Sequence, residues 1–211
     1  MTDSPLNHKD NKVKIAQSIF GNGMKDKVEV DSISIMNSAV LSLFASGRTS
    51  GVVIESGQGL TCAVPIFEGY ALPHAIKTIN VSGQDVTQFL FDSLVADGVR
   101  IDEANIDNVR EIKEQMCAVA MDYERSIRGP DPLDEEGRMY ELPDDKGIIT
   151  VNHKTRFAAT ELLFNPDIAG IKSQGISQIA YESIQKCDLD LQITLYGNIV
   201  ITGGTSMIPG F

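Results

Sequence analysis

The sequence contains few of the residues that hold small secreted or metal-stabilised domains together. Its three cysteines, Cys62, Cys117 and Cys187, are far apart and form no CxxC pair, so neither a disulfide framework nor a zinc site is indicated. The three histidines are equally scattered and form no HxxxH pair, which argues against a histidine-based metal centre. We therefore predict no metal bound directly by the protein and a reducing, intracellular compartment.

Long apolar runs and basic clusters are also absent. The first five residues, Met1 to Pro5, are polar and do not form a signal peptide, and no segment is long and apolar enough to span a bilayer. The 211 residues carry a formal net charge of −11 without a local basic patch, and such a surface repels phosphate backbones. We expect no membrane and no nucleic acid among the partners.

Strand patterns and helix patterns mix along the chain. Apolar residues at 51–55 and 60–66 predict two strands, and residues 56–59 (Ser-Gly-Gln-Gly) predict a tight hairpin turn between them. Further strands are expected at 28–36, 138–142, 148–151 and, as a buried strand, 198–201. Helices are expected from Asp10 or Asn11 to Phe20, at 38–45, between Gly83 and Gly98, after Asp102 as far as Met116, and at 176–186. Residues 117–123 are expected to be extended and 126–137 to form an exposed loop. The mixture indicates an α/β or α+β fold.

Two glycine turns are candidates for an anion or nucleoside site. Backbone N–H groups in the turn at 56–59 can form a nest for a phosphate, although a plain hairpin is the commoner meaning of this pattern. The second turn, Thr202-Gly203-Gly204-Thr205, follows an apolar strand and can present N–H donors. A sharp turn without a ligand is the alternative.

A third candidate is a set of charged residues on one helix. Arg110, Lys113 and Glu114 are three and four residues apart, so they share a helix face. Taken alone, this spacing is more typical of a solvated face with an ion pair.

Taken together, these segments resemble actin. The matching stretches, in order along the chain, are PLN (5–7), AVLSLFASGRTSG (39–51), VPIFEGYALPHAI (64–76), YELPD (140–144), SIQKCD (183–188) and GGTSMIPG (203–210). The resemblance implies an incomplete α/β fold of the actin and Hsp70 type (ribonuclease H-like), in which two halves clamp a nucleotide. Residues 1–45 would be a remnant of the first half, 46–81 with 172–211 the larger subdomain of the second half, and 82–171 its inserted smaller subdomain. The family's first phosphate hairpin and its C-terminal segment would fall outside this chain.

The resemblance also implies a set of nucleotide-binding residues. The second phosphate hairpin would be Ser56, Gly57, Gln58, Gly59 and Leu60, and the nucleoside pocket would use Gly83, Arg110, Lys113, Glu114, Gly203, Gly204, Thr205 and Met207. Ile208 stands where actin usually has the tyrosine that stacks on adenine. The implied ligand is ATP or ADP with magnesium, bound weakly because half of the phosphate clamp is missing.

The positions that resemble the catalytic ones of actin are substituted. Ser38 stands where actin has the glutamine that orients the attacking water. Glu55 and Gln58 stand in place of two aspartates that hold the metal-bound waters, and Cys62 replaces a histidine. Because phosphoanhydride hydrolysis depends on positioning and charge stabilisation, these changes argue against an efficient enzyme.

The first functional hypothesis is accordingly a cytoplasmic, cytoskeletal actin-like protein that acts by protein–protein or filament contacts. Its partners would be actin or actin-binding proteins. The plug loop of actin corresponds to residues 165–171, where Asp167 and Ala169 make the tip more polar and smaller, and this should weaken an apolar filament contact. The alternatives are a working nucleotide-dependent ATPase, and a truncated fragment that exposes apolar surface and associates with a chaperone or chaperonin.

Overall fold

The structure, a computed structural model, describes residues 35–101, 106–128, 138–142 and 147–211. Contacts divide the chain into two units, Met1–Ser38 and Ala39–Phe211, and the fold below is that of the second unit. The predicted helix ending at Phe20, residues 28–34 of the first predicted strand, most of the predicted loop at 126–137 and the turn at 143–146 lie outside the described residues.

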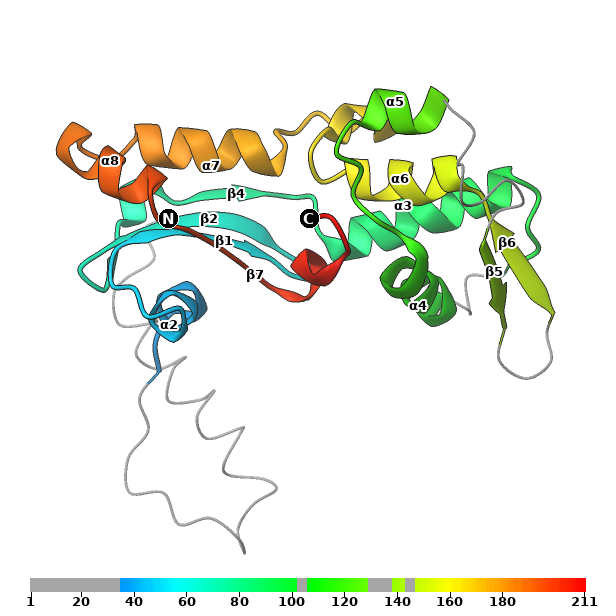
Figure 1. The fold of residues 1–211 in the computed structure, drawn as a ribbon, viewed down its shortest axis with the longest axis horizontal. Helices are drawn as coiled ribbons and strands as arrows, with labels where there is room; N and C mark the ends of the chain where they lie inside the picture. The colour runs from blue at the N-terminus through cyan, green and yellow to red at the C-terminus, as the bar shows by residue number, and fades with distance from the viewer. Residues whose placement is uncertain (1–34, 102–105, 129–137, 143–146) are drawn as a thin grey trace, which may run out of the picture. The chain divides into compact units, whose positions relative to one another are not determined.

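A mixed sheet forms the centre of this unit (Figure 1). Its strands are β1 (Gly51–Ser56), β2 (Thr61–Phe67), β3 (Tyr70–Ala71), β4 (Lys77–Ile79) and β7 (Ile199–Thr202). The order is β3-β2-β1-β7, with β4 paired to β2. β1 and β2 are antiparallel, with Glu55 opposite Cys62, whereas β1 and β7 are parallel, with Glu55 opposite Thr202. The turn after β1 and the turn after β7 therefore lie at the same end of the sheet, where the carboxyl ends of these two strands meet.

Helices cover both faces of the sheet (Figure 1). On one face, α2 (Ser38–Ala45) buries Ala39, Val40 and Leu43 against Val53 and Val64. On the other face lie α7 (Ile176–Gln185) and α8 (Leu189–Tyr196), whose buried apolar residues join the core under β1 and β2. Both faces of β1 and β2 are thus withdrawn from water, which explains their nearly continuous apolar sequences.

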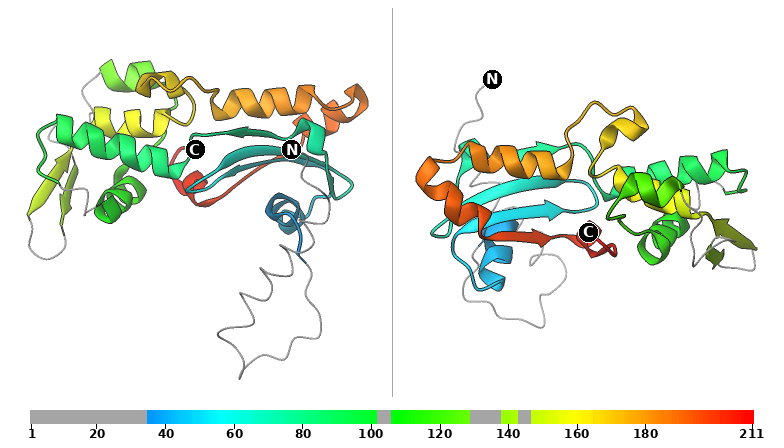
Figure 2. Two further views of the ribbon diagram at one scale, coloured as in Figure 1. Left: turned by 180° about the vertical axis from the view of Figure 1, so that it is seen from behind. Right: turned by 45° about the horizontal axis from the view of Figure 1, so that its top comes forward.

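Further helices and a second hairpin lie between β4 and β7 in the chain (Figure 2). These are α3 (Gly83–Ala96), α4 (Ile106–Met116), α5 (Tyr123–Arg128), α6 (His153–Glu161) and the antiparallel pair β5 (Arg138–Glu141) and β6 (Ile148–Val151). Short 3-10 turns occupy Pro73–Ala75 (η1), Pro166–Ala169 (η4) and Gly204–Met207 (η5). The start of α3 is fixed by Ser82, whose backbone N–H and hydroxyl both donate to Asp85 Oδ2 at 2.8 Å.

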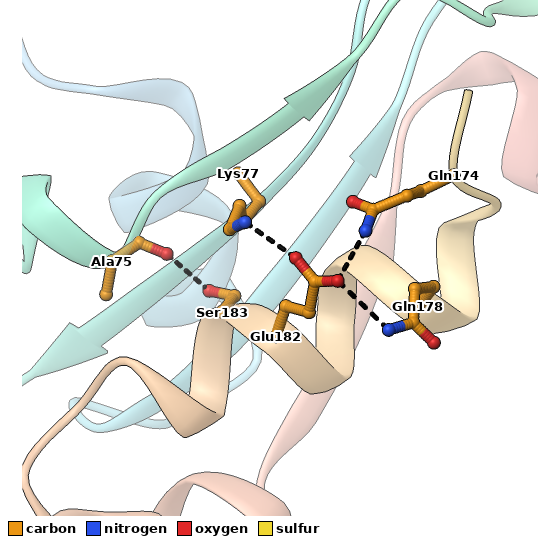
Figure 3. Close-up of polar contacts among 6 residues, drawn as sticks. All are labelled: Ala75, Lys77, Gln174, Gln178, Glu182 and Ser183. Carbon is orange, nitrogen blue, oxygen red and sulfur yellow. Dashed lines mark hydrogen bonds and ion pairs between the residues drawn. The ribbon is translucent and has the colours of Figure 1, made fainter. Parts of the chain in front are cut away.

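A polar cluster fastens α7 to the sheet (Figure 3). Lys77 Nζ lies 2.6 Å from Glu182 Oε2, and the side-chain amides of Gln178 and Gln174 donate to Oε1 of the same carboxylate. Ser183 donates to the carbonyl of Ala75 at 2.8 Å. The hydrogen bonds to the Glu182 carboxylate, that of Gln178 first and that of Lys77 next, lower the pKa of Glu182 to about 2.

Both predicted hairpins and the helices at 38–45, 83–96, 106–116 and 176–185 are confirmed. Two predictions are wrong, the burial of one strand and the start of one loop. The strand at 198–201 is not buried: β7 lies at the edge of the sheet, and Ile199 and Ile201 are 45% and 48% exposed. α5 begins at Tyr123, so residues 126–128 are helical rather than loop, and Tyr123 is the one residue of the segment predicted to be extended that is helical. α6 and α8 were not predicted. No helix of the described residues has both the length and the apolar character needed to cross a bilayer.

Candidate functional site

A pocket of about 380 Å³ lies where three distant parts of the sequence meet. The hairpin turn after β1, the middle of α4 and the turn after β7 supply its walls. The lining residues are Gln58, Arg110, Lys113, Glu114, Gly204, Thr205, Met207 and Ile208. The lining combines charged and amide groups with thioether and aliphatic ones, which suits a ligand with both polar and apolar parts. The volume is within the usual range of about 300–1,000 Å³ for ligand sites.

The hairpin turn is held in place through its carbonyl groups. Gly57 N–H closes the turn by donating to Leu60 O at 2.9 Å, and Gly57 O accepts bonds of 2.9 Å from Gly83 N–H and Thr205 Oγ1. Gln58 O accepts from Gln84 N–H at 2.8 Å. The turn is therefore joined by hydrogen bonds both to the start of α3 and to the segment after β7. The two glycine turns are thus close enough to belong to one site.

The turn after β7 requires glycine for a geometric reason. Gly203 has φ +104° and ψ 156°, a backbone region open essentially to glycine alone. A Cβ at this position would lie 2.2 Å from the carbonyl oxygen of Ser56, whereas one at Gly204 would meet nothing within 4 Å. Gly203 thus allows the turn to pack closely on the end of β1, and Gly204 presents open backbone at the pocket wall.

One residue of the charged face of α4, Lys113, is not solvated as the sequence spacing favours, whereas Glu114 is exposed and Arg110 is partly exposed. Lys113 is only 5% exposed, and its Nζ donates to Gly83 O and Thr87 Oγ1, each at 3.0 Å. Burial is the main cause of a lowered pKa for Lys113, and the positive charge of Arg110 lowers this pKa further. Arg110 forms its ion pair with Asp107 at 3.1 Å. The expectation of a solvent-exposed face is therefore wrong for Lys113.

Several residues predicted for the site lie beside the pocket rather than in its wall. Ser56, Gly57, Gly59, Leu60, Gly83 and Gly203 are not among the lining residues. Ser56 is fully buried, and its Oγ shares a hydrogen bond of 3.2 Å with Thr61 Oγ1. Gly57, Gly83 and Gly203 bring the surrounding segments into contact.

The four substituted positions occupy different surroundings. Gln58 lines the pocket. Glu55 and Cys62 face each other across β1 and β2, and Cys62 is buried, which raises the pKa of its thiol, with Glu55 contributing. Ser38 is the first residue of α2. Within the described part of the chain, no group of three or more His, Cys, Asp or Glu side chains is placed to hold a metal ion.

A smaller cavity that sequence reasoning missed adjoins the pocket. It has about 160 Å³, shares Gln58 and Arg110 with the first pocket, and is otherwise lined by Gln84, Thr87, Gln88, Ile106 and Asp107. Its amide and hydroxyl groups come from the first turns of α3. The sequence feature that marks this region is Gly83, the first residue of α3. It does not predict a cavity, because the cavity forms only where α4 packs beside α3.

The sheet, its two helical layers and the pocket between strand-end turns define an α/β protein whose ligand site is built from loops following adjacent strands. The sequence model of the family described as Actin matches residues 1–108 and 101–211. These two matches span the whole chain, which therefore belongs to the actin family. The resemblance stated from the sequence and the α/β fold it implied are both confirmed.

Proposed function

We propose that this actin-like chain is a cytoskeletal protein that acts through contacts with other proteins and binds ATP or ADP without hydrolysing it efficiently. The pocket between the two glycine turns and α4 is the observation that carries the proposal. A nucleotide bound in this pocket would fix the conformation of the segments around it.

The residues of the pocket fit a nucleotide chemically. Gly204 has open space where a Cβ would stand, so a ligand can approach the main chain there. Arg110 offers a positive charge for phosphate, and the carboxylate of Glu114 can accept hydrogen bonds from sugar hydroxyls. Met207 and Ile208 supply apolar atoms for a base. Magnesium bound with the nucleotide would neutralise part of the phosphate charge.

The same residues offer little for hydrolysis. Phosphoryl transfer needs a positioned water and groups that stabilise developing charge. Gln58 places a neutral amide in the pocket, and the Cys62 thiol is buried with a raised pKa. Neither group can act as a general base at neutral pH, which favours binding without turnover.

Exposed apolar side chains support a role in protein contacts. Leu189 and Ile193, four residues apart on α8, are 79% and 83% exposed, so they share one uncovered face of that helix. Actin or actin-binding proteins are the partners that family membership suggests, and the cytoplasm is the compartment in which they would meet.

Nucleotide binding is tested by calorimetric titration of the chain with ATP and ADP, alongside phosphate release. We expect saturable binding, release no faster than in buffer, and a loss of affinity of about tenfold in Arg110→Met, because a charge-assisted bond is removed. Arg128→Met is the matched control, since Arg128 is exposed on α5 and paired with Glu124. Absence of binding, or equal affinity in the two variants, would contradict the site. Steady phosphate release would favour the ATPase alternative.

Protein contact is tested by co-sedimentation with actin filaments in salt and magnesium. We expect the chain to pellet with actin, and Ile193→Asp to pellet less because a charge is placed on the apolar face of α8. Met139→Asp, on exposed β5, is the control. A chain that neither pellets nor binds actin would refute the cytoskeletal role, and constitutive chaperone association would favour the fragment alternative.

A further inference from the structure

Lys113 is a buried cation whose hydrogen bonds go to the protein itself. Its ammonium donates to Gly83 O and Thr87 Oγ1 at 3.0 Å, and Thr87 Oγ1 in turn donates to Gly83 O at 2.9 Å. Lys113 is not a member of the ion pairs Lys77–Glu182, Arg110–Asp107 and Arg128–Glu124. A buried ammonium with neutral acceptors costs free energy, so the bonds it makes should have a structural purpose.

These bonds continue into the walls of the pocket. Gly83 N–H donates to Gly57 O, which also accepts from Thr205 Oγ1, both at 2.9 Å. A Cβ on Gly83 would lie 2.4 Å from Thr205 Oγ1, so the start of α3 packs directly against the segment after β7. One continuous chain of hydrogen bonds thus runs from α4 through α3 to both glycine turns.

We infer that Lys113 is a positioning residue, which ties α4 to the start of α3 so that the pocket forms as one hydrogen-bonded unit. The inference rests on the proposed function in treating this pocket as a nucleotide site. Arg110 and Glu114 line the pocket within one turn of Lys113 on the same helix, so the tether sets where their side chains stand. Lys113 then acts through its neighbours more than through contact with the ligand.

The test compares Lys113→Met with Lys77→Met in the full chain. Methionine keeps the apolar length of lysine and removes the ammonium. Lys77 is a suitable control because it is half-buried, forms an ion pair with Glu182 and lies on β4 away from the pocket lining. Thr87→Val, which removes one acceptor and keeps the side-chain volume, serves as a milder variant should Lys113→Met fold poorly.

Two readouts are needed, amide hydrogen exchange without ligand and the affinity for ADP. In Lys113→Met we expect exchange at Gly83 and Gln84, whose N–H groups bond the hairpin turn, to rise about tenfold, and the affinity for ADP to fall about tenfold. Thr87→Val should shift both in the same direction by less. Lys77→Met should leave both within about twofold of the wild type.

The outcomes separate the explanations. A loss of affinity in Lys113→Met without faster exchange would mean that Lys113 touches the ligand, and would overturn the inference. Equal changes in Lys113→Met and Lys77→Met would mean a general loss of stability, and would overturn it too. If the wild type binds no ADP, the proposed function fails, while the exchange measurement still decides whether Lys113 holds the pocket together.

Discussion

Gly203 offers the sharpest test of how the two glycine turns are joined. Replacing it by alanine adds a Cβ that would stand 2.2 Å from Ser56 O, 2.6 Å from Ser56 C and 3.0 Å from Ser56 N. These are backbone atoms of β1, so the clash cannot be relieved by a side-chain rotation. Either β1 or the turn after β7 must move.

The expected cost has two parts. Alanine at φ +104° and ψ 156° occupies a region that costs an L-residue about 1–3 kcal/mol. Displacing backbone in a buried, hydrogen-bonded strand adds to this, and together we expect the free energy of unfolding to fall by about 3 kcal/mol or more. ADP binding should weaken as well, because Thr205 can no longer reach Gly57 O.

Gly204→Ala is the matched control, one residue further on. Its Cβ would meet nothing within 4 Å, so we expect a change in stability within about 0.5 kcal/mol. Urea unfolding followed by circular dichroism measures both variants. A difference between Gly203→Ala and Gly204→Ala of less than about 1 kcal/mol would refute the close packing argued above.

Three further predictions concern stability and reactivity. Because the folded pKa of Glu182 is lowered to about 2, the hydrogen bonds and ion pair of its carboxylate stabilise the fold fully above about pH 4.5 and less as the pH falls towards 2. Glu182→Gln should flatten this part of a plot of melting temperature against pH, and an unchanged plot would show that the cluster around Glu182 does not cause the acid dependence. Leu90→Ala, at a fully buried position of α3, should lower the free energy of unfolding in urea by about 2–5 kcal/mol. Leu189→Ala, at a 79% exposed position, should lower it by less than about 0.5 kcal/mol. Similar losses in the two variants would contradict the burial of Leu90. Cys117, buried with its pKa raised to about 12 by burial, should resist iodoacetamide at pH 8 until the chain is unfolded, and rapid labelling of the native protein at this cysteine would show that its segment opens.

Much of the site could be predicted as segments but not as side-chain roles. The turn at 56–59, the turn at 202–205 and the helix carrying Arg110 were each visible in local sequence, and the family resemblance grouped them. The burial of Lys113 could not be predicted from the sequence, because a lysine three residues after an arginine occurs with the same spacing on a solvated helix and on a packed helix. Its environment depends on α3, which supplies Gly83 O and Thr87 Oγ1 from about thirty residues earlier in the chain.

The sequence by itself determined what local forces decide: the hairpins, the apolar faces of α3, α4 and α7, and the glycines at sharp turns. Only the tertiary structure decided which segments meet. β7 has the apolar sequence of an interior strand and lies at the edge, because exposure depends on which strands and helices pack beside it. The pocket likewise exists only because parallel pairing of β1 and β7 brings the turns that follow them to the same end of the sheet. There, α3 contacts the turns through Gly83, and Lys113 joins α4 to α3.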